Sequence, residues 1–270
     1  MSNTNSTKGN YVSTHRNKLF KYIIFDVLRS KVVIIYALFL MLFSFGIIYL
    51  GNDVSKATIS LLNIVLLLVP LISIVFGTMY FYNLKEFKEL LLSQPVSRSS
   101  IIIGEYLGLS SSLSLSFLLG TGIPLLFAGF STEHFYLLMV GVLLTFVFVG
   151  LSFLSSVITN DKVKGMGISL FIWFYSALIF DGLILTILFA FDDYPLEKII
   201  LILTFLNPID LARIIVLLKL DISILMGYTG AVYSKFFGTW TGMGLSIIFL
   251  MLWALIPTLG AIKIFSKKDF

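Results

Sequence analysis

The 270-residue sequence contains no cysteine and little charge. Without cysteine, neither a disulfide nor a thiolate metal site can form. Charged residues make up 12% of the chain, whereas about a quarter is usual for a soluble domain. Hydrophobic residues make up 58%, and the mean hydropathy is +1.02. These values exclude a soluble domain and indicate an integral membrane protein. No polar block is long enough to fold separately, so a single membrane domain is expected.

Short motifs of common enzymes are also missing. The sequence has no GxxxxGK[ST] loop for nucleotide phosphates, no HExxH zinc motif and no GxSxG nucleophile motif. Its two histidines, His15 and His134, are far apart, and its eight methionines show no short repeated spacing. We therefore expect no catalytic residue, no metal site and no cofactor on this chain, and no nucleic-acid partner.

Long apolar runs predict an all-α protein with six transmembrane helices, because about 20 apolar residues cross the hydrocarbon layer. Within the third run, Gly120, Gly122 and Pro124 predict a break or kink. The predicted spans are about 32–50, 59–82, 100–130, 135–158, 166–191 and 240–264.

The segment before the first span divides into two parts. Residues 1–15 are polar and are expected to form a disordered cytoplasmic tail. Between Arg16 and Lys31, apolar Leu19, Ile23 and Val27 recur every four residues among charged ones. This spacing predicts an amphipathic helix on the membrane surface, which begins a single transmembrane domain of residues 16–270.

The distribution of basic residues sets the orientation. With the N-terminus inside, all but five of the 19 lysines and arginines lie on the cytoplasmic side. The sequence therefore favours a multi-pass protein with both termini in the cytoplasm. The five outer exceptions are Lys56, Lys198, Arg213, Lys219 and Lys235.

A charged stretch at 83–98 separates the second and third spans and faces the cytoplasm in this topology. Apolar and charged residues alternate there at helical spacing, which predicts an amphipathic helix of about three turns. Pro95 ends this helix, and Ser97 can cap the next one. The apolar face needs a partner surface; the alternative is a loop helix that only touches lipid headgroups.

The outer loop between spans five and six is unusually apolar. Its two runs, 196–206 and 209–220, have the length of re-entrant or interfacial segments. Asn207 can cap a helix that begins at Pro208, with Asp210 in the first turn. We expect a helical hairpin dipping into the outer leaflet; the alternative is one continuous kinked span over 196–220.

Two acidic residues lie within apolar runs, where a charge is costly. Asp181 falls in the outer leaflet and could lie near the hairpin, with Arg213 as a partner. Glu105 falls near the inner boundary and could simply reach the interface. For both residues, a functional role and a purely structural one remain open.

Several stretches carry a resemblance to a known family. They are Asp26–Lys31, Leu90–Arg98 followed by Gly104 and Gly108, Trp173 with Asp181, and Leu206–Arg213. In these stretches and in its order of segments, the chain resembles the permease subunits of ABC-2 type ABC transporters, especially the NosY-type permeases of nitrous oxide reductase maturation.

The resemblance implies a homodimer in the bacterial inner membrane, bound to a separate cytoplasmic ABC ATPase that holds ATP and Mg. It also implies that the 84–94 helix, within residues 84–98 that we call the coupling segment, docks this ATPase together with the N-terminal surface helix. A periplasmic copper-handling protein would meet the outer face. The residues of the coupling segment that the resemblance singles out are Leu84, Lys85, Phe87, Lys88, Leu90, Leu91, Gln94, Pro95 and Arg98.

Two other functions remain compatible with the sequence. One is the same machine with another cargo, such as a lipid, a glycan or a toxic small molecule. The other is a membrane scaffold or sensor that has no ATPase.

Overall fold

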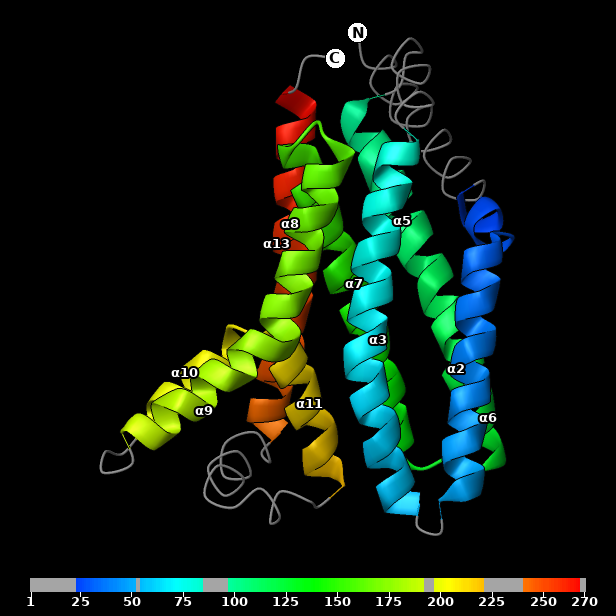
Figure 1. The fold of residues 1–270 in the computed structure, drawn as a ribbon, viewed down its shortest axis with the longest axis vertical. Helices are drawn as coiled ribbons and strands as arrows, with labels where there is room; N and C mark the ends of the chain where they lie inside the picture. The colour runs from blue at the N-terminus through cyan, green and yellow to red at the C-terminus, as the bar shows by residue number, and fades with distance from the viewer. Residues whose placement is uncertain (1–22, 52–53, 85–96, 192–196, 221–239, 268–270) are drawn as a thin grey trace, which may run out of the picture.

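The structure is a computed structural model that describes residues 23–51, 54–84, 97–191, 197–220 and 240–267. Its described part consists of helices and connecting segments, with no strand. The helices form an elongated bundle (Figure 1). They are α2 (Lys31–Leu50), α3 (Val54–Asn83), α5 (Arg98–Phe117), η1 (Leu118–Gly122), α6 (Ile123–Phe127), α7 (Thr132–Ile158), α8 (Lys162–Phe174), η2 (Tyr175–Ile179), α9 (Phe180–Ala190), α10 (Glu197–Phe205), α11 (Pro208–Lys219) and α13 (Trp240–Lys267).

Six helical stretches of the described chain are long and apolar enough to cross a membrane, which confirms the predicted all-α class and number of spans. The third stretch runs from α5 to α6 and the fifth from α8 to α9. The pair α10 and α11 is bent by 110° and would count as a seventh only if taken as one span. Placement of this pair as a re-entrant hairpin in the outer leaflet stays a prediction.

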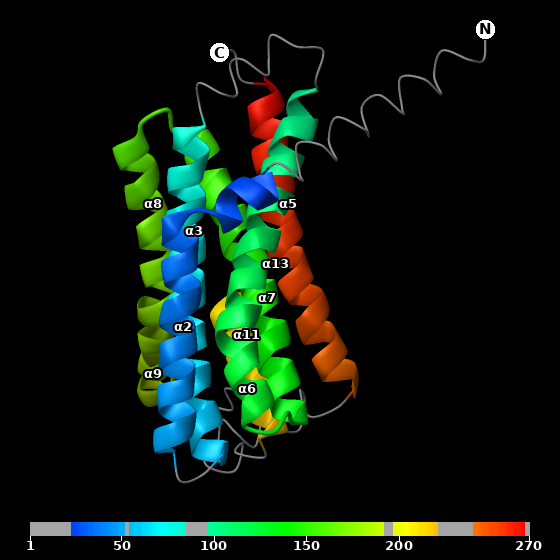
Figure 2. The same ribbon diagram turned by 90° about the vertical axis from the view of Figure 1, so that its right-hand side faces the viewer.

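Helix α7 lies at the centre of the bundle and packs against α3, α5, α8, α11 and α13 (Figure 2). In both α5–α6 and α7, 67% of the most apolar window is buried, compared with 11% in α8–α9. Large apolar side chains on α2, α8 and α13 remain exposed. An outer ring of apolar faces around a packed centre suits lipid or a second chain as surroundings.

The helix ends sort into two groups. The starts of α2, α5 and α8 and the ends of α3 and α13 lie at one end of the bundle, here called the basic end (Figure 1). The predicted inner cations of the described chain lie there, at the ends of these helices: Arg29, Lys31, Arg98, Lys162, Lys164, Lys263 and Lys267. The opposite end carries the start of α7 and the end of α11. This sorting agrees with the charge rule used above.

Two π-helical turns interrupt the spans. The first, η1, contains Gly120 and Gly122 and confirms the predicted irregularity in the third span. Gly120 brings η1 close to the backbone of Ala37 in α2. The second, η2, was not predicted, because its sequence has neither glycine nor proline. Beyond η2, α9 turns sideways from the bundle (Figure 1).

Polar side chains cap several helix starts. Ser97 accepts a hydrogen bond from the Ser100 amide, which confirms the predicted cap of α5. Ser131 caps α7 and forms a capping box with His134. His134 thus lies buried in the first turn of α7, because Ser131 starts the helix three residues before the predicted span at 135–158.

The predicted surface helix is described only from residue 23. Residues 23–28 are helical, with Ile23 and Val27 buried and Asp26 and Arg29 exposed, as the spacing predicted. The contact of this helix with lipid headgroups stays a prediction, and residues 1–22 lie outside the described part of the chain.

Candidate functional site

The last turn of α3 is fixed to the connection between α7 and α8. The Tyr82 hydroxyl lies 3.2 Å from the Ser156 carbonyl oxygen and 3.0 Å from that of Thr159. Lys162 Nζ donates to Asn83 Oδ1 at 3.0 Å. The Tyr82 hydroxyl thus lies at the end of α7, where carbonyl groups have no partner within the helix. The connection and the end of α3 therefore form one structural unit.

A second group of contacts strengthens the same unit deeper in the bundle. Thr78 Oγ1 and Ser169 Oγ lie 2.7 Å apart, and Ser169 Oγ lies 2.5 Å from Ser155 Oγ. These three hydroxyls join α3, α8 and α7. At Gly165 in α8, a β-carbon would collide with the Tyr82 ring, so only glycine allows this approach.

Aromatic packing extends the unit to the last helix. The Phe81 ring lies 5.5 Å from that of Phe153 in α7 and 6.4 Å from that of Phe265 in α13, both in edge-to-face geometry. A force applied to the end of α3 therefore reaches three other helices through direct contacts. We call Thr78, Phe81, Tyr82 and Asn83, with their partners in α7, α8 and α13, the α3 anchor.

The predicted ATPase-docking residues follow directly after the α3 anchor. Leu84 is the last described residue before them, and Arg98 begins α5 behind the Ser97 cap. The other predicted residues, Lys85, Phe87, Lys88, Leu90, Leu91, Gln94 and Pro95, lie outside the described residues. The structure thus brings both ends of the coupling segment to the basic end.

The predicted residues of the outer loop form a cluster around one arginine. Arg213 Nη1 lies 2.9 Å from Asp181 Oδ2 and 3.0 Å from Asp210 Oδ1. Asp210 is 5% exposed, whereas the side chains of Arg213 and Asp181 are 28% and 36% exposed. The expected proximity of Asp181 and Arg213 is therefore observed. Two carboxylates share one guanidinium, so the charges of these three side chains sum to −1 when all are ionised.

Asn207 completes this cluster, here called the Arg213 cluster. Its Oδ1 accepts from the Ile209 amide at 3.1 Å, which is the predicted helix cap. Its Nδ2 donates to Asp210 Oδ2 at 2.9 Å and to the Ser176 carbonyl oxygen at 2.8 Å. Pro208 occupies the first turn of α11, as predicted. One side chain therefore caps α11, holds Asp210 and attaches η2.

Glu105 lies inside the bundle. Its side chain is 1% exposed and sits on α5 among buried glycine and serine residues. The expectation that it simply reaches the interface is wrong, because the face of α5 that carries it is packed. Its functional role stays a prediction.

Direct packing connects the two ends of the bundle. In the described part of the chain, no group of three or more histidine, aspartate or glutamate side chains could hold a metal ion. What the molecule offers is an anchored helix end at one pole and an ionic cluster in the opposite half, joined through α7, which packs against both α3 and α11. Lys219 adds a contact between α11 and α7, because its Nζ lies 5.1 Å from the centre of the Tyr136 ring.

Comparison with known proteins identifies the family. The family model of ABC-2 family transporter proteins matches residues 24–270. The chain belongs to this family. The ABC-2 chain is also similar to the "Probable ABC transporter permease protein NosY" of Stutzerimonas stutzeri, with 28% identity over 211 residues, covering 70% of this chain and 76% of the relative. A protein of the same description from Pseudomonas aeruginosa is 28% identical over 217 residues, covering 73% of this chain and 79% of the relative.

Family membership confirms the resemblance found in the sequence. This ABC-2 chain is a multi-pass membrane protein and the permease subunit of an ABC transporter. The family implies an ABC ATPase as partner, and it implies that the chain is not itself an enzyme.

Sequence reasoning missed three features of the site. Tyr82 and Gly165 were not singled out, because their contact joins segments that are distant in the sequence. The glycine in Lys162-Val-Lys-Gly165, directly after a helix cap, was the available signal. The hydrogen bond from Asn207 to Ser176 left no signal in the sequence, because its acceptor is a backbone carbonyl oxygen, which every residue has.

Proposed function

We propose that this permease transmits ATP-driven closure of its ATPase from the coupling segment, residues 84–98, to the opposite face of the membrane. The observation that carries the proposal is the α3 anchor, because the coupling segment continues directly from a helix end that is fixed to α7, α8 and α13. Without such an anchor, movement of a surface helix would only fray the last turn of α3.

The proposed route continues along α7 to the Arg213 cluster. Helix α7 packs against both α3 and α11, and the cluster ties α11 to α9 through Asp181 and to η2 through Ser176. A rigid helix with contacts at both ends transmits a displacement, whereas a single salt bridge would not. In this proposal the basic end and both termini lie in the cytoplasm of a bacterial cell, and the Arg213 cluster lies in the outer half of the membrane.

The proposal extends to partners and cargo. The chain works as a homodimer in the inner membrane, with ATP and Mg held by the ATPase. The resemblance of the sequence to NosY-type permeases, the name that both relatives carry, supports a role in assembling the copper centre of nitrous oxide reductase, with a periplasmic copper-handling protein at the outer face. Copper binds to that partner and not to the permease.

The docking role is tested by co-purification of the ATPase in mild detergent. We expect charge reversal of Lys85 and Lys88, or Phe87→Ala, to remove the ATPase from the complex while membrane insertion is unchanged. Charge reversal of Lys56, at the opposite end of α3, serves as the matched control and should keep the ATPase bound. An unchanged ATPase yield in the first variants would refute docking, and no ATPase in any preparation would favour a scaffold or sensor.

The cargo is tested by deleting the gene and measuring copper in nitrous oxide reductase from the same cells. We expect a copper-deficient reductase that regains copper when the permease is restored. A reductase with its full copper content in the deletion strain would refute the copper role and would favour export of another cargo, such as a lipid or a glycan.

A further inference from the structure

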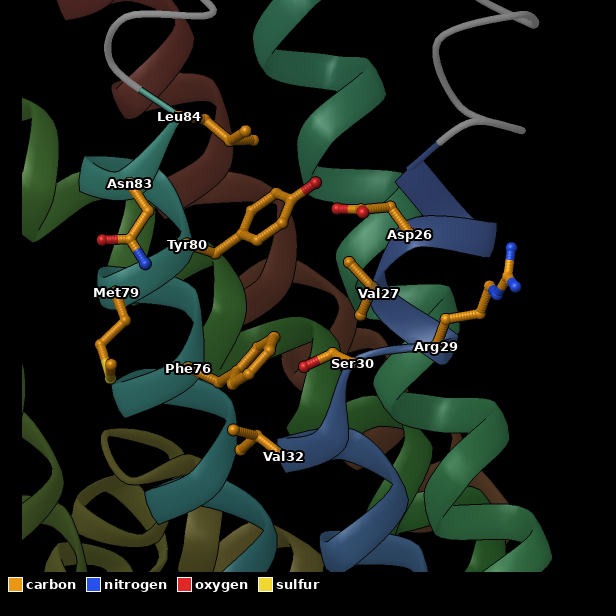
Figure 3. Close-up of a pocket in the computed structure, with 10 residues that line it drawn as sticks. All are labelled: Asp26, Val27, Arg29, Ser30, Val32, Phe76, Met79, Tyr80, Asn83 and Leu84. Atoms are coloured by element: carbon orange, nitrogen blue, oxygen red, sulfur yellow. The ribbon is translucent and has the colours of Figure 1, made fainter.

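A cleft separates the short helix at residues 23–28 from the last two turns of α3 (Figure 3). It has a volume of about 470 Å³ and lies at the basic end, between the start of α2 and the end of α3. The lining combines polar and apolar side chains: Asp26, Val27, Arg29, Ser30, Val32, Phe76, Met79, Tyr80, Asn83 and Leu84.

The polar groups that point into the cleft favour a cation. The Asp26 carboxylate and the Tyr80 hydroxyl point toward one another across it, and the Ser30 hydroxyl also points inward (Figure 3). Arg29 lines the rim, but its guanidinium points away from the opening. Asp26 is exposed and forms no ion pair with any residue of the described chain. One carboxylate and two hydroxyls supply negative charge and acceptors, which an ammonium group needs.

Two aromatic rings add to this preference. Phe76 and Tyr80 lie one helical turn apart on α3, with ring centres 6.5 Å apart and planes inclined by 18°. The faces of such rings attract an ammonium group, and the attraction increases as the group loses water. A ligand that entered between α2 and α3 would meet these rings and the Asp26 carboxylate together.

The depth of the cleft matches the outer layers of a membrane. Its lining on α3 runs from Asn83 to Phe76, which is about 10 Å of helix rise. The headgroup layer occupies about 5–7 Å on each side of the hydrocarbon core. The lining is longer than this layer, so a lipid in the cleft would place its headgroup beside Asp26, Tyr80 and Asn83. Its acyl chains would begin beside Val32 and Phe76, which lie lower (Figure 3).

We propose that this cleft binds a membrane lipid through a primary ammonium headgroup, with Asp26 as the counterion and the acyl chains leaving between α2 and α3. The exposed apolar side chains on α2, including Ile35, Leu38 and Leu42, would border these chains. A lipid in this position bridges the surface helix to the end of α3, so it would stiffen the basic end. The proposal stands independently of the cargo.

The test uses the purified full-length chain, with any subunit that co-purifies, and native mass spectrometry. The probes are dioctanoyl phosphatidylethanolamine, dioctanoyl phosphatidylglycerol and glycerophosphoethanolamine, which has the amine headgroup without acyl chains. We expect the ethanolamine lipid to bind in preference to the other two. Asp26→Asn should weaken its binding about fivefold, the upper range for a solvent-accessible ion pair, whereas the matched variant Arg29→Gln should not.

Each other outcome overturns the proposal. Equal binding of phosphatidylethanolamine and phosphatidylglycerol, or unchanged binding of the ethanolamine lipid in Asp26→Asn, would refute an ammonium site. If Arg29→Gln lost phosphatidylglycerol binding and Asp26→Asn kept it, the cleft would bind an anionic headgroup. If glycerophosphoethanolamine bound as well as dioctanoyl phosphatidylethanolamine, the ligand would be a soluble amine and not a lipid. If Asp26→Asn fails to assemble, Tyr80→Phe replaces it, with an expected weakening of about threefold for one lost hydrogen bond; unchanged binding there also refutes the site.

Discussion

Arg213 places one guanidinium nitrogen between the carboxylates of Asp181 and Asp210. Replacing it by glutamine would leave two carboxylates side by side, one of them buried. Because the pair is only partly buried, we expect the free energy of unfolding to fall by about 2 kcal/mol, less than for a fully buried ion pair. Denaturant unfolding of the purified chain in detergent measures this change.

Asp181 provides the control for that prediction. Asp181→Asn keeps the contact between Arg213 and Asp210 and removes only a charge on a partly exposed side chain, so we expect less than about 1 kcal/mol of destabilisation. Combined with Arg213→Gln, it should recover part of the lost stability, because it removes the repulsion. Because Asp181 ties α9 to α11 in the proposed route, we also expect Asp181→Asn to impair transport more than assembly. An Arg213→Gln protein as stable as the native one would contradict the account of the cluster.

Asn207 tests whether the cluster or the helix cap matters. Asn207→Asp keeps an oxygen that can accept from the Ile209 amide but loses both hydrogen bonds that Nδ2 donates. It also adds a carboxylate next to Asp210. We expect this variant to destabilise the chain by about 2 kcal/mol or more, although aspartate caps helices as well as asparagine does. Thermal unfolding of the variant and of the native chain measures this difference. Equal stability would mean that Asn207 serves only as a cap.

At the scale of helices, the contact of Gly165 with Tyr82 ties α8 to α3. Gly165→Ala would push a methyl group into the Tyr82 ring, and overpacking of this kind costs about 1–3 kcal/mol. Gly167 lies two residues further along the same helix and has open space around it. Gly167→Ala should therefore be neutral or stabilising by up to about 1 kcal/mol.

The pair of glycine variants also tests coupling. If the α3 anchor transmits force, Gly165→Ala should reduce ATP-driven transport, while the ATPase stays bound and hydrolyses ATP. Gly167→Ala should behave like the native permease in the same assay. Equal transport in both variants would separate the anchor from function.

The helices differ in how far the sequence predicts them. All six spans follow from hydropathy, because each run is long and bounded by charged or capping residues. The turn η1 was anticipated from Gly120 and Gly122, whereas η2 was not, because Tyr175–Ile179 has no residue that disfavours a regular helix. Hydropathy also placed the start of α7 three residues late, because Ser131 sets it through a side-chain hydrogen bond.

The candidate site shows the same division. The contact between Asp181 and Arg213 was expected because a charge in an apolar run needs a partner. The helix start at Asn207 and Pro208 was expected from helix capping. The α3 anchor was missed, because Tyr82 and Thr159 are joined by a contact that only the packed fold creates. Glu105 was expected to reach the interface but is buried, because hydropathy does not show which face of α5 packs against other helices.

At the scale of the molecule, two poles with different chemistry support the account. The basic end carries the α3 anchor, the ends of the coupling segment and the cleft beside Asp26. The opposite half carries the Arg213 cluster. Helix α7 connects the two, with Ser131 at one of its ends and Thr159 at the other. ATP is hydrolysed in the cytoplasm, so the basic end must face the cytoplasm for the proposed coupling to work.

Cysteine labelling in intact cells measures this orientation directly, since the natural sequence contains no cysteine. Single cysteines replace Asn160 at the basic end, Phe130 at the opposite end of α7, and Lys88 in the predicted docking helix, which lies outside the described residues. Asn160 and Phe130 are exposed, so a membrane-impermeant maleimide can reach whichever side is accessible. We expect labelling of Phe130→Cys in intact cells and of Lys88→Cys and Asn160→Cys only after permeabilisation. Labelling of Lys88→Cys and Asn160→Cys from outside the cell would contradict the proposed coupling.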